Sequence, residues 1–483
     1  MLMQLKMNTI LKGVSWLNKE KLYIDGDYVD SAKGRTIAVV SPINQEILAQ
    51  VADATKKDVE LAVLAAKNSQ RVWKNVPFLE KIQLASKFLD YLKEHRDEIV
   101  KTMVEELGSA ITFTESTQFD FYIRELEDLL ELLDGFEFIE SFRGYDMVKD
   151  PVGVVACITP WNYPLGQITK KILPALLMGN SVILKPSTQT PLTAHWVAKA
   201  IDAAGYPRGV FNLLTGKGSR LGDCLTTHPD INMVTFTGST EVGTKVAASA
   251  MTHMKRVTME LGGKSASIIL EGADLDLALD KTLDTVCYNS GQTCSALTRL
   301  LVPEKMKHQV EQMLLEKVEN YKVGHPFNRD VQMGPVQSFS QLEKIRNYIA
   351  IGLDEGAKLL YGESPKDMKV KPVIFTNVKN NMKIAQDEIF GPVLCVISYR
   401  DTDEAISLAN DSEYGLSGAV FGEQEEATAV ARELKTGNIF VNTASKTTNV
   451  PFGGFKYSGV GRENGIEGVL EFVELKALIN PLD

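Results

Sequence analysis

Cysteine and histidine are scarce in this sequence, and the cysteines are widely spaced. Among 483 residues there are five cysteines and six histidines, and no Cys-x-x-Cys pair occurs. An odd cysteine count without such pairs argues against a secreted disulfide framework and favours a reducing compartment. Cys294 has no second cysteine close enough in sequence to suggest a disulfide or a metal site. We therefore expect no metal centre.

Long apolar runs and an excess of basic residues are also missing. The longest apolar stretches, such as GVVACI at residues 153–158, are too short to span a bilayer. The first 21 residues have no long apolar core and no small-residue cleavage site, so we interpret them as a short extension. The net charge is -10, whereas nucleic-acid binding needs a basic surface. We expect a cytoplasmic protein that binds neither membranes nor nucleic acid.

The chain is long enough for more than one domain, and its pattern is typical of an α/β protein. Residues 55–130 have apolar positions at helical spacing. From Val152, short apolar runs such as GVVACI, SVILKP, VFNLLTG and MVTFTG alternate with helical patterns, and a second such block runs from SASIIL to NIFVN. Alternating strands and helices predict parallel sheets with crossover helices. Two such blocks predict a cleft between them, a usual place for a site.

Two predicted strand ends carry residues that suit a phosphate or a ribose. MVTFTGSTEVG predicts a strand, a tight turn and a helix, with Gly238 and Gly243 on either side of Ser239. Such a turn lets a phosphate approach the N–H groups at a helix start. The spacing differs from the usual dinucleotide fingerprint, however, and an ordinary strand-to-helix turn has the same pattern. Lys185 ends the predicted strand SVILK, and Thr188 follows it. A cation here could hold a ribose or a phosphate, although a solvated lysine explains this segment as well.

Cys294 differs from the other cysteines in its neighbours. Cys157, Cys224, Cys287 and Cys395 lie in apolar or helical patterns that are typical of small buried hydrophobic residues. Cys294 lies among small and polar residues in YNSGQTCSA, and a nucleophilic thiol needs such access. No histidine is close to it in sequence, so the spacing predicts no Cys-His pair.

Two other residues could act with this thiol. Glu260, in VTMELGGKSA, stands at an apparent strand end before two glycines. A carboxylate whose pKa is raised by burial can take a proton from water near neutral pH. Asn162, in ITPWNYPLGQ, is a neutral amide between two prolines. A neutral donor can stabilise a developing oxyanion without titrating.

Taken together, the motifs resemble those of the aldehyde dehydrogenase superfamily. In chain order they are PWNYP, KPS, FTGSTEVG, ELGGKS, GQTCSA, EIFGPV, PFGGFKYSGVGRE and FVELK, and the match runs from LYIDGDYVDS to VLEFVELKAL. Each motif is short, but their order is very specific. The resemblance implies an α/β protein with a Rossmann-like cofactor-binding domain, an α/β catalytic domain and a small β oligomerisation extension. It also implies oxidation of an aldehyde to a carboxylic acid with NAD or NADP.

The resemblance implies roles for the catalytic residues. Cys294 would attack the aldehyde carbon as a thiolate, and Asn162 and the main-chain N–H of Cys294 would form the oxyanion hole. Hydride transfer to nicotinamide would leave a thioester, and Glu260 would activate the water that releases the acid. Glu463 matches a supporting acidic residue near the cysteine. Phe452 matches an aromatic on the substrate side, although core packing explains it equally well.

The resemblance also implies the cofactor contacts. Glu388 would hold the nicotinamide ribose and Lys185 the adenosine ribose, while Ser239 and Trp161 would contact the pyrophosphate. The expected cofactor-binding residues are Thr159, Pro160, Trp161, Lys185, Ser187, Thr188, Gly218, Phe236, Thr237, Gly238, Ser239, Val242, Leu261, Gly262, Glu388 and Phe390. For Phe390, as for Phe452, core packing is an equally good explanation.

One position departs from many NAD-preferring relatives. They carry a glutamate three residues after the lysine of the KPS segment, and that carboxylate binds the ribose 2′-hydroxyl and would repel a 2′-phosphate. Thr188 stands at this position here. Lys185 and the hydroxyls of Ser187 and Thr188 could accept a phosphate instead. We therefore expect good use of NADP, while the loss of a repulsive carboxylate does not exclude NAD.

The resemblance suggests a domain division and an oligomer. Residues 1–130 and 152–260 would form the NAD(P)-binding domain, residues 261–465 the catalytic domain, and residues 131–151 and 466–483 the oligomerisation segments. FEFIESFRGYDMVKDPVG predicts two strands around Gly144, and VLEFVELKALINP is similarly apolar. Both could pair with sheet edges of another subunit, so we expect a homodimer or homotetramer.

Two other functions remain open within the same resemblance. A CoA-acylating relative would pass the acyl group to CoA, but such members generally lack the carboxylate at Glu260. A non-catalytic relative would keep the fold without turnover, but Cys294, Asn162, Glu260 and Glu388 are all present.

The substrate is the least determined feature. The entrance is expected near Tyr163, Gln167, Lys170, Lys171, Thr293, Ser295 and residues 442–450. Lys170 and Lys446 could attract an acidic aldehyde, although solvated lysines are the plainer interpretation. KPSTQTP resembles NADP-using succinate semialdehyde dehydrogenases, but their second cysteine is replaced by Ala296. Thr293 replaces the basic residue of members that act on phosphorylated glyceraldehyde, so we expect a broad aliphatic or aromatic aldehyde substrate.

Overall fold

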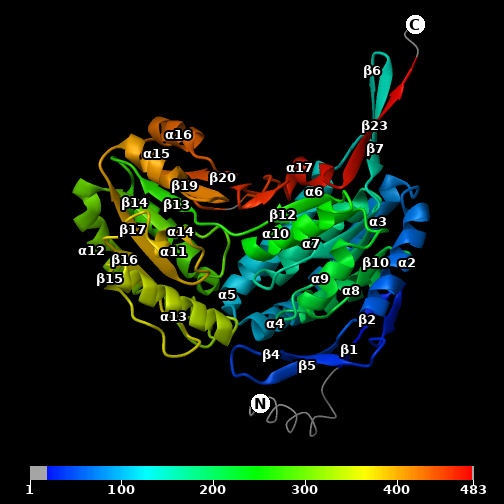
Figure 1. The fold of residues 1–483 in the computed structure, drawn as a ribbon, viewed down its shortest axis with the longest axis horizontal. Helices are drawn as coiled ribbons and strands as arrows, with labels where there is room; N and C mark the ends of the chain where they lie inside the picture. The colour runs from blue at the N-terminus through cyan, green and yellow to red at the C-terminus, as the bar shows by residue number, and fades with distance from the viewer. Residues whose placement is uncertain (1–18, 446, 481–483) are drawn as a thin grey trace.

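The computed structural model describes residues 19–445 and 447–480, which form two α/β bodies around separate sheets (Figure 1). Most of the expected N-terminal extension and Lys446 lie outside the described residues. Among the residues that are described, no helix is both long and apolar enough to cross a membrane.

The first body is built on an eight-stranded sheet. Its strand order is β22 (Gly459–Val460), β12 (Arg256–Glu260), β11 (Met233–Thr237), β8 (Val154–Ile158), β9 (Ser181–Lys185), β10 (Phe211–Leu213), β2 (Leu22–Ile24) and β3 (Asp27–Val29). The five central strands from β12 to β10 are parallel, and β22, β2 and β3 are antiparallel additions at the edges. The strands β8, β9 and β11 are buried along their whole length, as expected for parallel strands covered on both faces.

Helices cover this sheet on both faces. The helices between its strands are α7 (Pro164–Leu177), α8 (Leu192–Ala204), α9 (Gly218–Thr226) and α10 (Thr240–Met251). The expected helical segment before them contains α2 (Lys56–Trp73), α3 (Phe78–Glu94), α4 (Arg96–Leu107), α5 (Ile111–Phe113), the π-helix η2 (Thr114–Asp120) and α6 (Phe121–Leu132). Helix α8 ends at Gly205, whose φ of 83° gives the left-handed cap that glycine adopts readily.

The second body is built on a seven-stranded sheet. Its strand order is β15 (Lys358–Tyr361), β16 (Val373–Thr376), β17 (Val393–Tyr399), β14 (Arg299–Pro303), β13 (Ala266–Ile269), β19 (Ser417–Phe421) and β20 (Asn438–Val441). All neighbouring pairs are parallel except β15 with β16. The associated helices are α11 (Leu275–Cys287), η3 (Tyr288–Gly291), η4 (Glu304–Met306), α12 (Lys307–Val318), α13 (Phe339–Asp354), α14 (Lys383–Gln386), α15 (Thr402–Asn410) and α16 (Gln424–Glu433). The short helix α17 (Gly465–Leu470) packs against α6 and α7 of the first body instead.

A three-stranded antiparallel sheet projects from the first body (Figure 1). It is formed by β6 (Ile139–Phe142), β7 (Tyr145–Pro151) and β23 (Val473–Ile479), so segments more than 300 residues apart pair along seven positions. Two small sheets complete the fold, with strands β1 (Lys19–Glu20), β5 (Ile47–Ala52), β4 (Thr36–Val40), β18 (Tyr414–Gly415) and β21 (Phe455–Lys456). The predicted α/β class, both strand blocks and the β extension are confirmed.

The cysteines other than Cys294 mostly follow the expectation. Cys157, Cys287 and Cys395 are buried, and all five cysteines are free. Burial raises the pKa of Cys157 to about 12, so this thiol is protonated at neutral pH. Cys224 is only half-buried on α9, where its thiol lies 3.3 Å from the carbonyl of Arg220. Cys224 packs against the core cluster that contains Leu221 and Leu225, but only in part, so the expectation of a fully buried residue was wrong for it.

Candidate active site

Cys294 lies where two cavities meet. One cavity of about 360 Å³, which we call the aromatic pocket, and one of about 170 Å³, which we call the polar cleft, share this half-buried residue. The aromatic pocket is lined by Phe121, Tyr122, Glu125, Tyr163, Gln167, Lys170, Thr293, Cys294, Ser295, Ser417, Asn438, Ile439, Phe440, Val441, Thr443, Ser445, Thr447, Val450, Phe452 and Asn464. The polar cleft is lined by Pro160, Trp161, Asn162, Gln167, Thr237, Gly238, Ser239, Leu261, Cys294, Gln341, Lys344, Glu388 and Phe390. A thiol at this junction can meet one ligand from each side.

A strained turn after α11 places the thiol at this junction. Asn289 and Ser290 have φ values of 53° and 55°, and Gly291 follows with 73°. Two consecutive left-handed residues other than glycine are uncommon and tend to occur at functional sites. A Cβ on Gly291 would lie 2.2 Å from the carbonyl carbon of Gly391, so only glycine fits here. The turn is therefore held against the loop that carries Glu388.

Hydrogen bonds hold Asn162 against the turn that precedes Cys294. It is 4% exposed, and its side-chain Nδ2 donates to the main-chain carbonyl of Gln292, 2.9 Å away. Its own carbonyl accepts a hydrogen bond from Nδ2 of Asn289 at 3.0 Å. Asn162 lines the polar cleft together with Cys294, so the structure brings together two of the three predicted catalytic residues.

Glu260 lies behind the two cavities at the end of β12. It is 2% exposed and lines neither cavity, and neither of its oxygens has a hydrogen-bond partner among the described residues. A Cβ on Gly453 would lie 2.6 Å from its Oε1, so the carboxylate packs against bare backbone. Burial, and after it the negative charge of Glu463, raise the pKa of Glu260 well above its ordinary value.

Glu463 is part of a buried ion pair. It accepts a hydrogen bond from the ammonium group of Lys171, which is fully buried and also donates to the hydroxyl of Thr235 at 3.1 Å. We expected Lys171 at the substrate entrance, and this expectation was wrong. Helix α7 turns Lys171 toward the sheet, where Glu463 neutralises it, while the preceding Lys170 faces the aromatic pocket.

The turn after β11 opens into the polar cleft. Ser239 is the N-cap of α10 and accepts a hydrogen bond from the main-chain N–H of Val242 at 3.4 Å. The hydroxyl of Thr237 is buried without a partner, which leaves a donor available for a ligand. In the sheet, Thr237 pairs with Glu260, so the glycine turn and the carboxylate lie at the ends of adjacent strands.

Glu388 reaches the cleft from the second body. Its Oε1 accepts the main-chain N–H of Gly263 at 3.2 Å, and a Cβ on Gly262 would lie 2.8 Å from its Oε2. Burial raises the pKa of Glu388, and Lys344 opposes that rise. Phe390 stands edge-on to Trp161 with ring centroids 5.4 Å apart, so the two aromatic residues face each other across the cleft.

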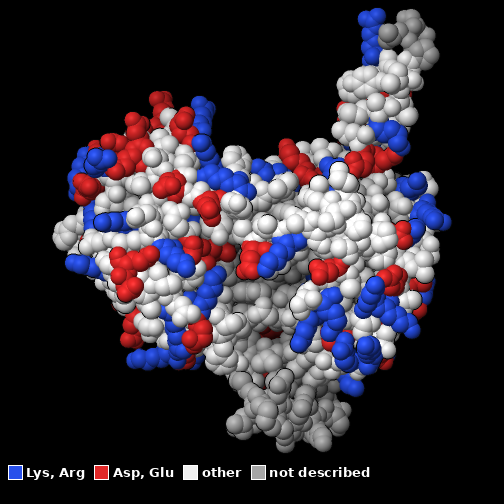
Figure 2. All heavy atoms as spheres, in the orientation of Figure 1, with Lys and Arg blue, Asp and Glu red and all other residues white. Residues whose placement is uncertain are grey.

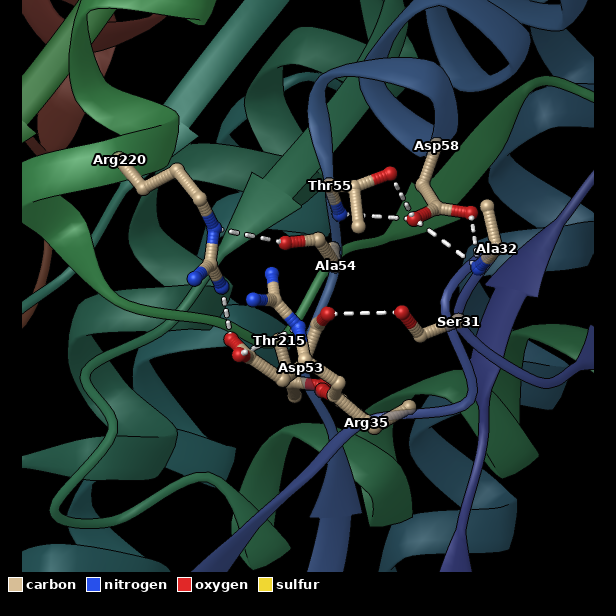
Figure 3. Close-up of polar contacts among 10 residues, drawn as sticks. Ser31, Ala32, Arg35, Asp53, Ala54, Thr55, Asp58, Thr215 and Arg220 are labelled. Carbon is tan, nitrogen blue, oxygen red and sulfur yellow. Dashed lines mark hydrogen bonds and ion pairs between the residues drawn. The ribbon is translucent and has the colours of Figure 1, made fainter.

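Lys185 and Gly218 form a separate group. A Cβ on Gly218 would lie 3.7 Å from Nζ of Lys185, and burial lowers the pKa of Lys185 to about 8. A polar cluster fixes the start of α9 near this group, with Arg220 paired to Asp53 and its Nε donating to the carbonyl of Ala54 at 3.1 Å (Figure 3). The predicted cofactor residues that line neither cavity are Thr159, Lys185, Ser187, Thr188, Gly218, Phe236, Val242 and Gly262.

Several site residues had no signal in the sequence. Gln341 and Lys344 on α13 line the polar cleft, and Gln341 donates to the carbonyl of Phe390 at 2.8 Å. Tyr122 enters the aromatic pocket just after the π-helix η2, and a Cβ on Gly166 would lie 2.3 Å from its ring. These residues stand in no motif, because their positions depend on tertiary packing. Within the described residues, no group of three or more His, Cys, Asp and Glu side chains could hold a metal ion.

The fold corresponds to that of a known family of oxidoreductases. The profile of the aldehyde dehydrogenase family matches residues 28–478, and the chain belongs to this family. A putative aldehyde dehydrogenase from Staphylococcus haemolyticus is 40% identical over 469 residues, covering 95% of this chain and 98% of the relative. The family and the enzyme class predicted from the sequence are confirmed.

Solved structures agree over the same extent. Aldehyde dehydrogenase C from Pseudomonas syringae, a cysteine-to-alanine mutant complexed with NAD+ and octanal, has a TM-score of 0.94 and 37% identity, covering 96% of this chain and 98% of that chain. A point mutant of betaine aldehyde dehydrogenase from Staphylococcus aureus, with NAD+ and a BME-modified cysteine, has a TM-score of 0.92 and 36% identity, covering 96% and 98%.

Proposed function

We propose that this protein oxidises an aldehyde to a carboxylic acid with NAD or NADP, using Cys294 as the nucleophile. The observation that carries this proposal is the position of Cys294 at the junction of the aromatic pocket and the polar cleft. The aldehyde would enter from the aromatic pocket and the cofactor from the polar cleft. Their reacting carbons would then meet at one sulfur atom.

The polar cleft fits a nicotinamide cofactor. Ser239 and the N–H groups at the start of α10 suit a pyrophosphate, and the unpartnered hydroxyl of Thr237 leaves a donor for it. Glu388 suits the hydroxyls of the nicotinamide ribose. The NAD+ complexes of the two similar structures support the same assignment. When bound, the cofactor accepts a hydride from the substrate carbon.

The nucleophile, the oxyanion donor and the general base are side chains of this protein. The thiolate of Cys294 adds to the aldehyde carbon, and the oxyanion that forms is stabilised by Nδ2 of Asn162 and the main-chain N–H of Cys294. Loss of hydride leaves a thioester on the sulfur. Glu260 turns toward the thioester and removes a proton from water. The hydroxide attacks the acyl carbon, and the C–S bond breaks. This releases the carboxylic acid and regenerates the thiolate of Cys294, and Glu260 then returns its proton to the solvent.

We propose further that NADP is used well. Lys185 is a buried cation without an ion-pair partner among the described residues, and no carboxylate stands at Thr188 to repel a 2′-phosphate. The hydroxyls of Ser187 and Thr188 are half-buried and can donate to a phosphate. NAD lacks only this phosphate, so the same site accepts it.

The domain division, assembly and location belong to the same proposal. Residues 1–130 and 152–260 serve as the cofactor-binding domain, residues 261–465 as the catalytic domain, and residues 131–151 and 466–483 as oligomerisation segments in a cytoplasmic homodimer or homotetramer. The projecting sheet supports the last point, because its strands carry exposed apolar side chains. These are Ile139, Phe142, Tyr145, Leu475, Leu478 and Ile479. Sedimentation equilibrium of the protein and of an Ile479→Asp variant tests the assembly.

We propose a small-molecule aldehyde substrate as the binding partner and no nucleic acid. Acidic and basic side chains are interspersed on the face shown in Figure 2, in keeping with the net charge of -10 and with no role in nucleic-acid binding.

Initial rates with a panel of aliphatic and aromatic aldehydes, each with NAD and with NADP, test the function. We expect reduced cofactor to form with several aldehydes and with both cofactors. If no aldehyde reacts with either cofactor, the proposed function is wrong. Stimulation by CoA with formation of an acyl-CoA would favour the acylating alternative instead.

A further inference from the structure

Three hydrogen-bonded glutamines, which we call the glutamine relay, join the loop after β9 to the turn that carries Cys294. Gln189 follows directly on Thr188, and its side-chain amide donates to Oε1 of Gln337. The main-chain N–H of Gln337 in turn donates to Oε1 of Gln292 at 2.8 Å. Gln292 is 1% exposed and Gln337 6%, so these contacts are shielded from water. The relay therefore connects a loop of the first body to the nucleophile turn.

Gln292 also contacts the predicted oxyanion donor. Its Nε2 donates to the carbonyl of Asn289 at 2.9 Å, so its side-chain amide is held at both ends. Its main-chain carbonyl accepts a hydrogen bond from Nδ2 of Asn162 at 2.9 Å. A shift of Gln292 would therefore move the donor amide and the thiol relative to each other. Both groups act on the same carbonyl group, and a misplacement of about 1 Å can lower a rate by about 10²-fold.

Two further hydrogen bonds hold the same turn. The hydroxyl of Ser290 donates to the carbonyl of Gly334 at 2.8 Å. The hydroxyls of Tyr163 and Thr293 share a hydrogen bond of 2.8 Å. These contacts remain when the glutamine relay is broken, so the turn should loosen without unfolding.

The other end of the relay lies in a loop with hydrogen bonds of its own. The main-chain N–H of Gln189 donates to Oγ of Ser187 at 3.2 Å. The hydroxyl of Thr190 donates to the carbonyl of Trp161 at 3.1 Å. Gln189 is thus held in place by its neighbours, and it can hold Gln337 in the same way.

We infer that Gln337 is a positioning residue for the reaction, which keeps the thiol of Cys294 and the amide of Asn162 aligned by holding Gln292. The inference rests on the proposed function and adds to it a residue that lines neither the aromatic pocket nor the polar cleft. Because Gln337 acts through Gln292, its loss should slow the chemical step and leave the binding of aldehyde and cofactor almost unchanged.

Gln337→Met tests this role, because methionine has a similar length but offers Gln189 only a weak acceptor. With saturating cofactor we expect the first-turnover rate constant to fall by about tenfold, less than for a full misplacement because two hydrogen bonds still hold the turn. The KM for aldehyde and the dissociation constant of the cofactor should change by less than about threefold. Gln337→Glu keeps an acceptor and should stay within about threefold of wild type. A first-turnover rate constant does not depend on the fraction of active enzyme.

Two further substitutions separate positioning from general packing. Gln332 is a matched control, because its Oε1 also accepts a main-chain N–H, that of Lys322 at 3.0 Å, in the segment that leads to Gln337. Gln332→Met should leave the first-turnover rate constant unchanged. Gln189→Met removes the other partner of the same hydrogen bond, so the double variant of Gln189 and Gln337 should be no slower than either single variant.

Hydrogen exchange of the peptide that spans residues 288–296 measures the hold on the turn without turnover. Its amides should exchange at least about fivefold faster in Gln337→Met than in wild type or in Gln332→Met. Unchanged exchange, faster exchange with an unchanged first-turnover rate constant, or fully additive single variants each overturn the inference while the proposed function stands. If wild-type protein oxidises no aldehyde at all, the proposed function fails and the positioning role fails with it.

Discussion

The side-chain amide of Asn162 donates a hydrogen bond to the main-chain carbonyl of Gln292, 2.9 Å away, two residues before the thiol. This contact aims a neutral donor at the cleft that Cys294 shares. The donor is ready before any charge develops, which is what electrostatic stabilisation of an oxyanion requires.

Asn162→Ala should therefore slow the chemical step. Loss of one oxyanion donor typically lowers kcat by roughly 10² to 10³. Rapid-mixing measurement of the first turnover detects the change, and titration with NAD should show cofactor binding that is little altered. A folded variant whose first turnover is within threefold of wild type would remove Asn162 from the mechanism.

The turn that carries the thiol should tolerate no side chain at Gly291. Gly291→Ala forces a left-handed alanine, at about 1–2 kcal/mol, and also places a Cβ 2.2 Å from Gly391, with an overpacking cost of about 1–3 kcal/mol more. Gly34 is the control, since its φ is 61° and nothing lies within 4 Å of a Cβ there. Thermal unfolding should show a clearly larger loss for Gly291→Ala than for Gly34→Ala, and equal losses would contradict the close packing.

The release of the acid should depend on the ionisation of Glu260. Its pKa is raised by burial and by Glu463, and a general base acts only when ionised. The rate of thioester hydrolysis should thus be lost as the pH falls through this raised pKa. Single-turnover rates between pH 5 and 9 test this expectation, and a rate of hydrolysis that does not fall toward pH 5 would contradict it.

Glu463→Gln should move that midpoint to lower pH. The substitution removes a negative charge beside Glu260 and leaves Lys171 unpaired, and both effects favour the ionised base. An unpaired buried lysine also destabilises the fold, by about 3–5 kcal/mol. The midpoint is therefore compared only among samples whose folding has been verified by circular dichroism. An unchanged midpoint in folded protein would show that Glu463 does not act on the base.

The cofactor preference should follow the charge at residue 188. Thr188→Glu introduces a carboxylate near Lys185, which repels a 2′-phosphate and accepts a ribose hydroxyl. The ratio of kcat/KM for NADP over NAD should fall by about tenfold or more, since each tenfold corresponds to about 1.4 kcal/mol. Thr188→Gln is the uncharged control. A ratio that does not move would place the 2′-phosphate elsewhere.

The sequence predicted the elements whose residues are buried on both faces. Runs such as GVVACI and MVTFTG are continuous apolar strands, and β8 and β11 are indeed buried throughout. The edge strand β22 could not be found in this way. It has two residues, one of them half-buried and the other exposed, and it exists because Gly459 and Val460 pair with the end of β12.

Catalytic residues could be predicted where they stand in a recognisable motif. The orientation of side chains that depends on tertiary packing could not be predicted. Cys294, Asn162 and Glu388 stand in recognisable segments, and the structure places them around one cleft. Lys170 and Lys171 are neighbours of identical type, and only the rotation of α7 decides which one faces the aromatic pocket. Such a choice depends on tertiary structure and leaves no trace in local composition.

A trapped thioester tests the central claim most directly. Glu260→Gln is mixed with an aldehyde and NADP, quenched in acid, and analysed by mass spectrometry of the intact chain and of its peptides. We expect one equivalent of reduced cofactor, slow turnover afterwards, and an added acyl mass on the peptide that contains Cys294. An acyl group on another of the five cysteines, or undiminished turnover without any adduct, would contradict the account.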